Sequence, residues 1–366
     1  MKPRIKEFHS DALGIFLWFL RVAWNPLTRK KWTEEATEVL KKMRQYRCSH
    51  VSFFMWLSDG KAEHVPLNNR TPYKRKLGKF DLETWNDRYW KLFRIFIKCC
   101  KDANIIPIPC VLMDRYCYLP YDKNKQGVSD FWSQEVRPYH VLLMDKTVGE
   151  IMTVYNALYE PTIEPINEAA HWGNHPKFHI IGQWFVDMWE KSLKKHTRLE
   201  KYVIDASHCE AGLGEFDKPK PCHVCGRPMG NAAYLTPSGK RRILPEYHGY
   251  SIRQNLTPAK WEPFINSAWE IAKFSEDCGG GPEALGYSVG GFTVGTAEQN
   301  KDMLKKMWRE SKNKGKKAVW GLFPMESLYI DPKKRWIEDY SMDRLNDTMV
   351  WERYKKAREA WVGIHE

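Results

Sequence analysis

The sequence lacks any hydrophobic run that would anchor the chain in a membrane. The apolar segment at residues 12–20 ends at Arg21, and it is shorter than the roughly 20 residues that a membrane-spanning helix needs. No small-residue cleavage site follows it, so we expect no secretory signal peptide and no membrane partner. We expect a cytoplasmic protein, or one released by another route.

The sequence also lacks a disulfide framework and any sign of division into domains. Its nine cysteines are odd in number and scattered over 366 residues, which indicates a reducing compartment with most thiols buried. No glycine- or serine-rich linker, internal repeat or low-complexity stretch interrupts the chain. We therefore expect one domain over residues 1–366.

Signatures of nucleic-acid-binding folds are missing, although the chain is basic. Lys and Arg number 58 against 45 Asp and Glu, a formal net charge of +13, and such a balance is compatible with a polyanionic partner. The positive charge is scattered, and no helix-turn-helix, RNA-recognition or paired zinc-knuckle pattern accompanies it. A nucleic-acid-binding protein or nuclease remains an alternative function, but the charge favours a solvated basic surface.

Strand-like and helix-like segments alternate nearly end to end. Eight such strands, most followed by a helix, are typical of a parallel sheet and favour a closed (β/α)₈ TIM barrel over an open sheet. The strands are expected at 12–20, 50–56, 105–113, 150–158, 201–206, within 242–251, at 269–275 and at 318–323; the helices at 33–46, 81–103, 179–195, 258–268, 296–312 and 341–362. Asp81 is the expected N-cap of the second helix, and we expect long loops between strands and helices.

Two acidic side chains follow expected strands on opposite sides of this barrel. Glu160 comes after the expected fourth strand, and Glu276 comes after the seventh and before three glycines. The carboxyl ends of barrel strands carry the active site, so these carboxylates are expected to face one gap. Two facing carboxylates suit the cleavage of a glycosidic bond with retention of configuration, in which one attacks the anomeric carbon and the other donates a proton.

Short motifs at four strands carry a resemblance to a known family. They are Tyr159-Glu160-Pro161, Ser275-Glu276-Asp277, His248-Gly249-Tyr250 and the tryptophan of AVWGLF, Trp320. Their order and spacing resemble clan A glycoside hydrolases, close in style to family 5, over most of the chain. The resemblance implies a (β/α)₈ barrel and a retaining hydrolase of β-linked glycans, and we expect endo-acting cleavage of a polysaccharide or oligosaccharide.

The resemblance also implies a role for each matched residue. Glu160 would be the acid/base, Glu276 the nucleophile, Tyr250 a hydrogen-bonding partner of the nucleophile, and Trp320 the floor of a sugar subsite. The family pattern has Asn where this chain has Tyr159, and an Arg usual on the second strand is absent from HVSFFMW. Asn156 and Asn167 are the candidate replacements for the missing Asn, and Glu164 and Glu168 are alternative acids.

Aromatic and polar residues after other strands favour a carbohydrate partner. The chain contains 17 Trp, and flat aromatic rings provide stacking platforms for sugars. We expect Trp56 to supply stacking, and Asp114 and His248 to bind hydroxyl groups. A barrel that binds carbohydrate without cleaving it is a further alternative, motivated by Tyr159.

A cysteine pair marks an insertion between the fifth and sixth strands, at residues 207–241. Cys222-x-x-Cys225-Gly resembles half of a zinc knuckle, and Cys209 and His208 are the further ligands we expect, with His223 also in reach by sequence. A redox or disulfide pair, or two unrelated thiols, are the rival interpretations. The expected zinc is structural, and catalysis is expected to need no cofactor.

Overall fold

A computed structural model describes about two fifths of the chain. The described residues are 13–18, 26–45, 50–55, 72–76, 79–111, 134, 136–156, 159, 161–163, 178–197, 202–209, 241–248, 284–289, 309 and 317–322. The predicted helices at 258–268 and 341–362 lie outside these residues, and within 296–312 only Arg309 is described, in helical conformation.

Eight strands form one parallel sheet whose spatial order follows the order of the chain. They are β1 (Leu13–Trp18), β2 (His50–Phe54), β5 (Ile106–Cys110), β6 (Thr162–Ile163), β7 (Tyr202–Cys209), β8 (Arg241–His248), β9 (Ala284–Val289) and β10 (Lys317–Leu322). The sheet order is β5-β2-β1-β10-β9-β8-β7-β6.

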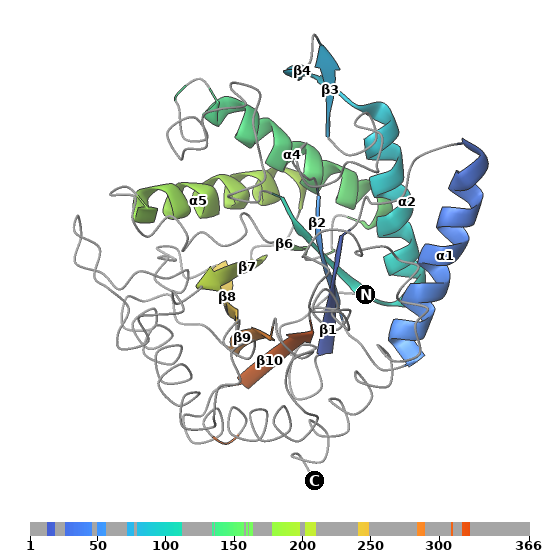
Figure 1. The fold of residues 1–366 in the computed structure, drawn as a ribbon. Coiled ribbons are helices and arrows are strands. Elements are labelled where there is room, and N and C mark those ends of the chain that lie inside the picture. The colour runs from blue at the N-terminus through green and yellow to red at the C-terminus, as the bar shows by residue number, and fades with distance from the viewer. Residues whose placement is uncertain are drawn as a thin grey trace, which may run out of the picture.

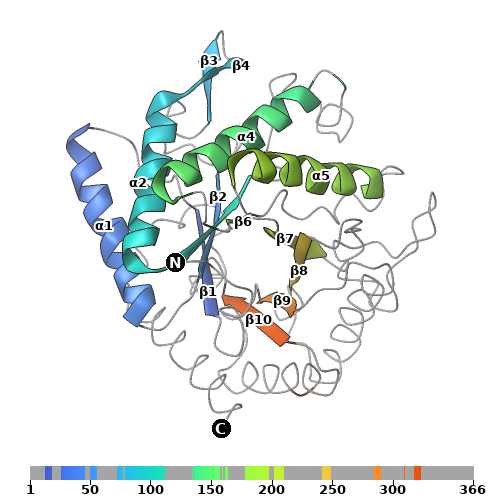
Figure 2. The same ribbon diagram turned by 180° about the vertical axis from the view of Figure 1, so that it is seen from behind.

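The sheet closes on itself, and this makes it a barrel. The first strand pairs with the last, with Gly14 opposite Gly321, and the two ends of the printed order, β5 and β6, contact each other. Figure 1 shows the strands as a ring with helices outside it, and Figure 2 shows the same ring from behind. The predicted (β/α)₈ architecture is therefore confirmed at the level of strand number, direction and order.

Among the described residues, four helices cover the outside of the first half of the ring. They are α1 (Pro26–Gln45), α2 (Asp87–Ala103), α4 (Arg137–Val154) and α5 (Phe178–His196). Neighbours pack side by side, α1 on α2, α2 on α4 and α4 on α5. In the core between β2 and α2, Phe53 is fully buried, and its ring centroid lies 5.0 Å from that of Phe96.

Helix α2 begins six residues later than predicted. Asp81 is not its N-cap, because Asp81 lies in β4 (Lys79–Trp85), the second strand of a hairpin with β3 (Tyr73–Lys76). The cap is Asn86, whose side chain accepts a hydrogen bond from the backbone N–H of Tyr89. An Asn serves as well as an Asp at this position, and the hairpin that takes up Asp81 leaves Asn86 as the cap.

The predicted fourth strand at 150–158 is wrong. Residues 150–154 form the last turns of α4, and the fourth barrel strand is β6, at Thr162–Ile163. The reason is periodicity: the side chains buried along α4 are spaced by three and four residues, as on one face of a helix. They are His140, Leu143, Met144, Thr147, Val148, Glu150 and Ile151.

Two further expectations concern membranes and thiols. Among the described residues, no helix is long and apolar enough to cross a bilayer. Cys99 and Cys100 of α2 are free and buried, and burial raises the pKa of both thiols above its usual value. For these two cysteines, the expectation of buried, unbridged thiols is confirmed.

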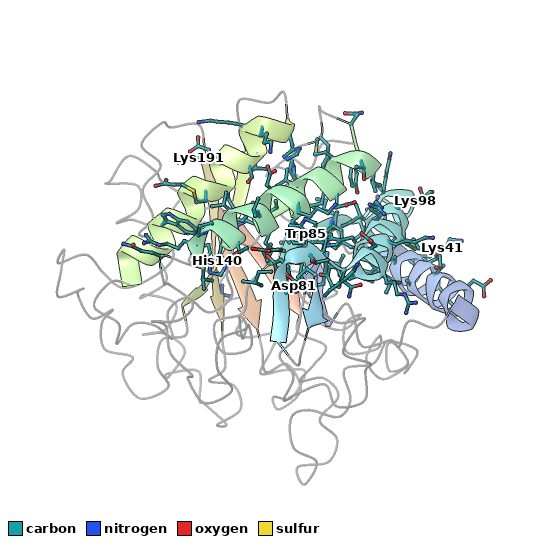
Figure 3. The ribbon with its side chains drawn as sticks, turned by 90° about the horizontal axis from the view of Figure 1, so that it is seen from above. Lys41, Asp81, Trp85, Lys98, His140 and Lys191 are labelled. Carbon is teal, nitrogen blue, oxygen red and sulfur yellow. The ribbon has the colours of Figure 1, made fainter. Side chains whose placement is uncertain are left out.

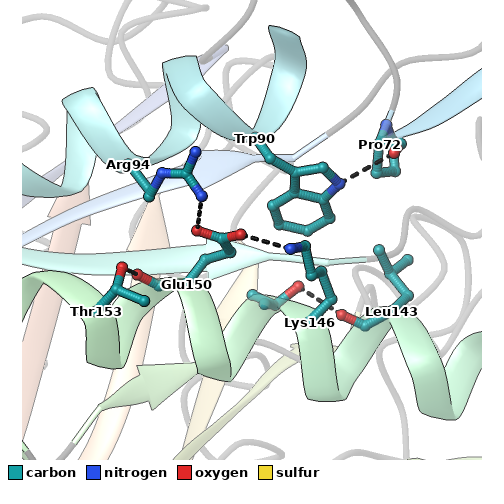
Figure 4. A network of polar contacts seen from close by, with 8 residues as sticks. Pro72, Trp90, Arg94, Leu143, Lys146, Glu150 and Thr153 are labelled. Carbon is teal, nitrogen blue, oxygen red and sulfur yellow. Dashed lines mark hydrogen bonds and ion pairs between the residues drawn. The ribbon is translucent and has the colours of Figure 1, made fainter. Parts of the chain in front are cut away.

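A buried carboxylate joins α2 to α4. Only 4% of the Glu150 side chain is exposed, and its two oxygens lie 2.7 Å from Nη1 of Arg94 and 2.6 Å from Nζ of Lys146. The Lys146 Nζ also lies 5.6 Å from the ring centroid of Trp90. Figure 4 shows that Trp90 extends the network to the chain before β3, because its Nε1–H donates to the carbonyl of Pro72.

We predict that Glu150→Gln destabilises the protein far more than the matched change Asp102→Asn. Gln keeps the shape of Glu150 but leaves two cations without their counter-charge, at a cost of about 1–3 kcal/mol once their partial exposure is allowed for. Asp102 pairs with Lys98 on the surface, where loss of one ion pair costs at most about 0.5 kcal/mol. Urea unfolding of both variants measures the two free energies, and equal effects would contradict the prediction.

Candidate functional site

The carboxyl ends of the barrel strands can be located from contacts at the end of β2. Met55, directly after β2, accepts a hydrogen bond at its carbonyl from the hydroxyl of Tyr89, in the first turn of α2. The β3–β4 hairpin is held beside the same helix end, because the backbone N–H of Asn86 donates to the carbonyl of Pro72 at 2.9 Å. The first turns of the outer helices and the hairpin therefore mark the face where barrel enzymes place their active sites.

The hairpin is fixed to two helices by aromatic and polar contacts. Tyr73 stacks on Trp85 with ring centroids 4.8 Å apart, and its hydroxyl donates to the carbonyl of Tyr139 in α4 at 3.2 Å. Burial raises the pKa of Tyr73 well above its usual value, so this hydroxyl keeps its proton. Figure 3 shows Asp81 of the hairpin and His140 of α4 on the same side of the helix layer, with Lys191 toward the other.

The opposite face carries the ends of α2 and α4. The Lys101 Nζ donates to the carbonyl of Val154 at 2.7 Å, and Tyr155 stacks on Tyr159 with ring centroids 3.7 Å apart. Asn156 lies in this connection, exposed, and its carbonyl accepts the N–H of Tyr159. This placement gives no support to Asn156 as a substrate contact, because it is at the amino ends of the strands.

The shifted fourth strand changes the position of the predicted acid. Glu160 precedes β6 in the chain, whereas it was expected to follow the fourth strand. The two alternative acids, Glu164 and Glu168, come after Ile163, the last residue of β6. Of the three candidate acids, only Glu164 and Glu168 follow β6 in the chain, where the chain leaves the strand at its carboxyl end.

The seventh strand is also displaced from its predicted position. The strand between β8 and β10 in the sheet is β9, at Ala284–Val289, and not residues 269–275. Glu276 therefore precedes the seventh strand instead of following it. After β9, residues 290–297 contain no Asp or Glu, and the first acid is Glu298.

The two faces of the sheet can be distinguished at β2. Val51 and Phe53 are fully buried, and the ring centroid of Phe53 lies 6.2 Å from that of Phe93 in α2, so these positions belong to the outer face. Successive strand residues alternate between faces, and paired residues of parallel neighbours share a face. Because Ile15 pairs with both Val51 and Leu322, the assignment carries round the ring to β10.

Polar residues gather at the inner face of the second half of the barrel. Gly321, one position before Leu322, belongs to the inner face and pairs with Ser288, which pairs with His248. Two positions earlier on each strand, Gly286 pairs with Glu246. The inner-face positions near the carboxyl ends of β7, β8 and β9 are Ser207, Glu246, His248, Gly286 and Ser288.

The pairing register of the strands assigns a face of the sheet to His248 and Trp320, two residues predicted from motifs. His248 is the last residue of the sixth barrel strand and is at an inner-face position of the register, and its contact to substrate stays a prediction. Trp320 is on the eighth strand, as expected, but pairs with Leu13 and Tyr287 and belongs to the outer face. Its predicted role as the floor of a sugar subsite gains no support from this placement.

Glu246 was missed by the sequence analysis. It lies two residues before the end of β8, inside LPEYHGYS, where attention went to the following His248-Gly249-Tyr250. The available signal was short: only Glu246, Tyr247 and His248 alternate between polar and apolar, and Leu244 interrupts the pattern of a strand with one polar face.

The candidate metal ligands are divided between described and undescribed residues. His208 and Cys209 are the last two residues of β7, and the pairing register with β8 shifts between Ser207 and Cys209. Over the ranges that the structure describes, no group of three or more His, Cys, Asp or Glu side chains could hold a metal ion. Cys222 and Cys225 lie outside the described residues, as do Trp56, Asp114 and Tyr250.

Comparisons with known proteins show similarity in structure but none in sequence. No family model matches the chain, and no curated protein is similar to it in sequence. A broad-specificity endoglucanase of glycoside hydrolase family 5 from Clostridium longisporum superposes with a TM-score of 0.60 at 12% identity, over 100% of both chains. A family 5 enzyme from Prevotella bryantii, solved with a xyloglucan tetradecasaccharide, gives 0.57 at 12% identity over 99% of both.

A third neighbour is larger than this chain. An exo-β-1,4-mannosidase from Opitutaceae bacterium strain TAV5 gives a TM-score of 0.52 at 12% identity, with 85% of this chain covering 51% of that one. Similarity at this identity shows the fold alone. The chain therefore has the (β/α)₈ fold found in family 5 glycoside hydrolases, as the sequence motifs predicted.

Proposed function

We propose that the protein is a glycoside hydrolase that cleaves β-glycosidic bonds of a polysaccharide or oligosaccharide, with endo-acting cleavage. The observation that supports this most is the match of the whole chain to family 5 barrels. A carbohydrate partner is also the natural ligand of an aromatic-rich barrel, since flat rings stack on sugars.

We propose Glu168 as the acid/base residue of this reaction. Glu168 follows β6 in the chain and is preceded by Asn167, which restores the Asn-Glu pair that Tyr159-Glu160 lacks. In the proposed retaining reaction, Glu168 in its protonated form donates to the leaving oxygen, and its carboxylate then removes a proton from the attacking water. Asn167 would supply the contact to the sugar for which Asn156 was the other candidate.

Glu168→Gln is predicted to lower turnover by about 10²–10⁴-fold, the usual contribution of a general acid, while the matched variant Glu160→Gln keeps near wild-type turnover. Reducing-sugar release from a panel of β-linked glucans, mannans and xyloglucan measures both. Thermal melting by circular dichroism checks that each variant is folded. Loss of activity in Glu160→Gln with full activity in Glu168→Gln would reverse the assignment.

One observation favours a second candidate function, a barrel that binds glycans without cleaving them. The seventh strand carries the nucleophile in the family that the chain resembles, and here no acid follows β9 until Glu298. A binding-only barrel would release no reducing sugar from any glycan of the panel, and its affinity for glycan would survive the Glu168→Gln change.

We also propose a structural zinc ion at the insertion after β7, with Cys209, Cys222, Cys225 and His208 as ligands. Two thiolates on a Cys-x-x-Cys turn need two more ligands to complete a tetrahedral site. The shift of register at the end of β7 breaks the strict alternation of a strand, which suits a site that draws on the adjacent His208 and Cys209.

A zinc site of this kind predicts close to one zinc ion per chain in protein purified without added metal. Elemental analysis should find this zinc in the wild type and lose most of it in the double variant Cys222→Ser/Cys225→Ser, with a lower melting temperature. Cys48→Ser is the matched control and should change neither quantity. Wild-type protein free of zinc and unaffected by a chelator would contradict the site.

A further inference from the structure

We propose that the β3–β4 hairpin binds the carboxylate groups of an acidic glycan, so that the substrate class of the protein is a β-linked polysaccharide bearing carboxylates. The inference rests on the proposed glycoside hydrolase function and deepens it by naming the kind of polymer. Three features of the hairpin support it: its charge, its attachment to the helices and its place at the carboxyl-end face of the barrel.

The hairpin concentrates positive charge on a short piece of chain. Lys74, Arg75 and Lys76 are consecutive in β3, and Lys79 begins β4. In the antiparallel ladder, Lys76 pairs with Lys79, and Lys74 pairs with Asp81, the one acid of these two strand segments. Because alternate residues of a strand share a face and paired residues lie on the same face, the register puts three lysines on one face of the ladder.

The acids near this face are engaged within the protein. The Asp81 carboxylate accepts hydrogen bonds from the backbone N–H of Glu83 at 3.2 Å and from the hydroxyl of Thr84 at 2.8 Å. The Glu83 carboxylate accepts one from the hydroxyl of Tyr139 in α4 at 3.5 Å. Lys74, by contrast, is exposed and forms no ion pair with any residue that the structure describes. The basic face of the ladder can therefore pair with an external anion.

The base of the hairpin is anchored in the helix layer. Tyr73 is only 1% exposed, and its hydroxyl donates to the carbonyl of Tyr139. Trp85, on which Tyr73 stacks, meets the ring of Trp90 edge-on with centroids 5.7 Å apart. The Trp90 Nε1–H donates in turn to the carbonyl of Pro72. A binding element anchored in this way has less conformational freedom to lose when a ligand binds.

The position of the hairpin suits a long chain molecule. The hairpin follows β2 in the chain and leads into α2, so it belongs to the face where barrel enzymes bind substrate. Figures 1 and 2 both show it at the rim of the ring, beyond the helices. A site at the rim can hold a distant part of a polymer that is cleaved at the ring, whereas a small sugar would not reach both places.

An acidic glycan fits this surface better than a nucleic acid does. Proteins that bind single-stranded nucleic acid combine basic grooves with aromatic rings on which bases stack. The rings at the base of this hairpin, Tyr73 and Trp85, stack on each other instead. Lysines bind carboxylates through charge-assisted hydrogen bonds and need no stacking partner. The hairpin therefore selects by charge, on a protein whose proposed substrate is a glycan.

Two polymers with the same β-1,4-glucan backbone test the proposal. Carboxymethyl cellulose bears carboxylates, and hydroxyethyl cellulose is neutral. Isothermal titration calorimetry of the full chain should show tighter binding of carboxymethyl cellulose at low salt. The difference should shrink as sodium chloride is raised, because salt screens exposed charges. Equal affinity for the two polymers at low salt would overturn the inference.

Variants of the ladder separate a local site from the effect of net charge. Lys74→Glu/Lys76→Glu should weaken binding of carboxymethyl cellulose by about tenfold and leave binding of hydroxyethyl cellulose unchanged. The matched control Lys41→Glu/Lys191→Glu changes the net charge equally at two exposed positions of α1 and α5, which Figure 3 shows away from the hairpin. The control should keep wild-type affinity, and an equal loss in both variants would contradict the site.

A milder pair guards against a folding defect. Lys74→Gln/Lys76→Gln removes the two charges without reversing them, and it should lose part of the affinity that the Glu pair loses. Thermal melting by circular dichroism checks that every variant is folded, and the Gln pair decides the question if the Glu pair melts early. Full affinity in a folded Gln pair would overturn the inference.

Binding and cleavage are measured separately, so the inference and the proposed function can fail independently. If carboxymethyl cellulose is cleaved, Lys74→Glu/Lys76→Glu should raise its KM and leave kcat nearly unchanged. Hairpin-dependent binding without cleavage of any glycan would support the site and contradict the hydrolase function. Cleavage of glycans with no preference for carboxylates would do the reverse. Tighter hairpin-dependent binding of a single-stranded oligothymidylate than of carboxymethyl cellulose would overturn the inference in favour of nucleic acid.

Discussion

The closure of the parallel sheet is the constraint on which the rest of the structure depends. Every backbone N–H and C=O of an inner strand needs a partner, and the pairing of β1 with β10 gives the first and last strands theirs. Closure also separates the two faces of the sheet completely. One face contacts the helices and is apolar at Val51 and Phe53; the other is enclosed by the ring and carries Glu246 and His248.

The helix layer fixes which end of the ring carries the chemistry. Glu150 of α4 holds α2 through Arg94, while its second oxygen pairs with Lys146 of its own helix. Trp90 ties α2 to Pro72 at the base of the hairpin. The first turns of both helices are thereby held beside the residue that ends β2. A rigid layer of this kind gives the carboxyl ends of the strands a stable frame, which a two-carboxylate site needs because its groups must keep a defined separation.

Strands whose residue pattern fits only a strand were predicted correctly from the sequence. The fourth and seventh strands, whose patterns are ambiguous or weak, were not. HVSFFMW is β-branched and aromatic and forms β2, and AVWGLF contains β10. The run EIMTVYNAL reads equally well as the end of a helix, and the buried side chains of α4 decide for the helix. The seventh strand was missed because ALGYSV contains a glycine and has weak strand propensity.

The first of these misses explains why the proposed acid differs from the predicted one. A catalytic residue in a barrel is predicted from its position directly after a strand. When the strand is assigned to an earlier segment of the chain, the acid predicted to follow it is also too early. Glu160 gave way to Glu168 as the proposed acid because β6 begins at Thr162. Glu246 escaped notice because it lies inside a strand, and its face is known only from the pairing register, which no single sequence provides.

The register between β9 and β10 is the central claim, and a disulfide trap tests it most directly. Ser288 and Gly321 are register partners on the inner face, and neighbouring strands lie about 4.8 Å apart, within the Cα range that a disulfide spans. Ser288→Cys/Gly321→Cys should cross-link on mild oxidation, as read by peptide mapping. Ser288→Cys/Leu322→Cys, with its two positions on opposite faces, should not. A cross-link in the second pair alone would mean that the strand is slipped by one residue, and Glu246 would then leave the inner face.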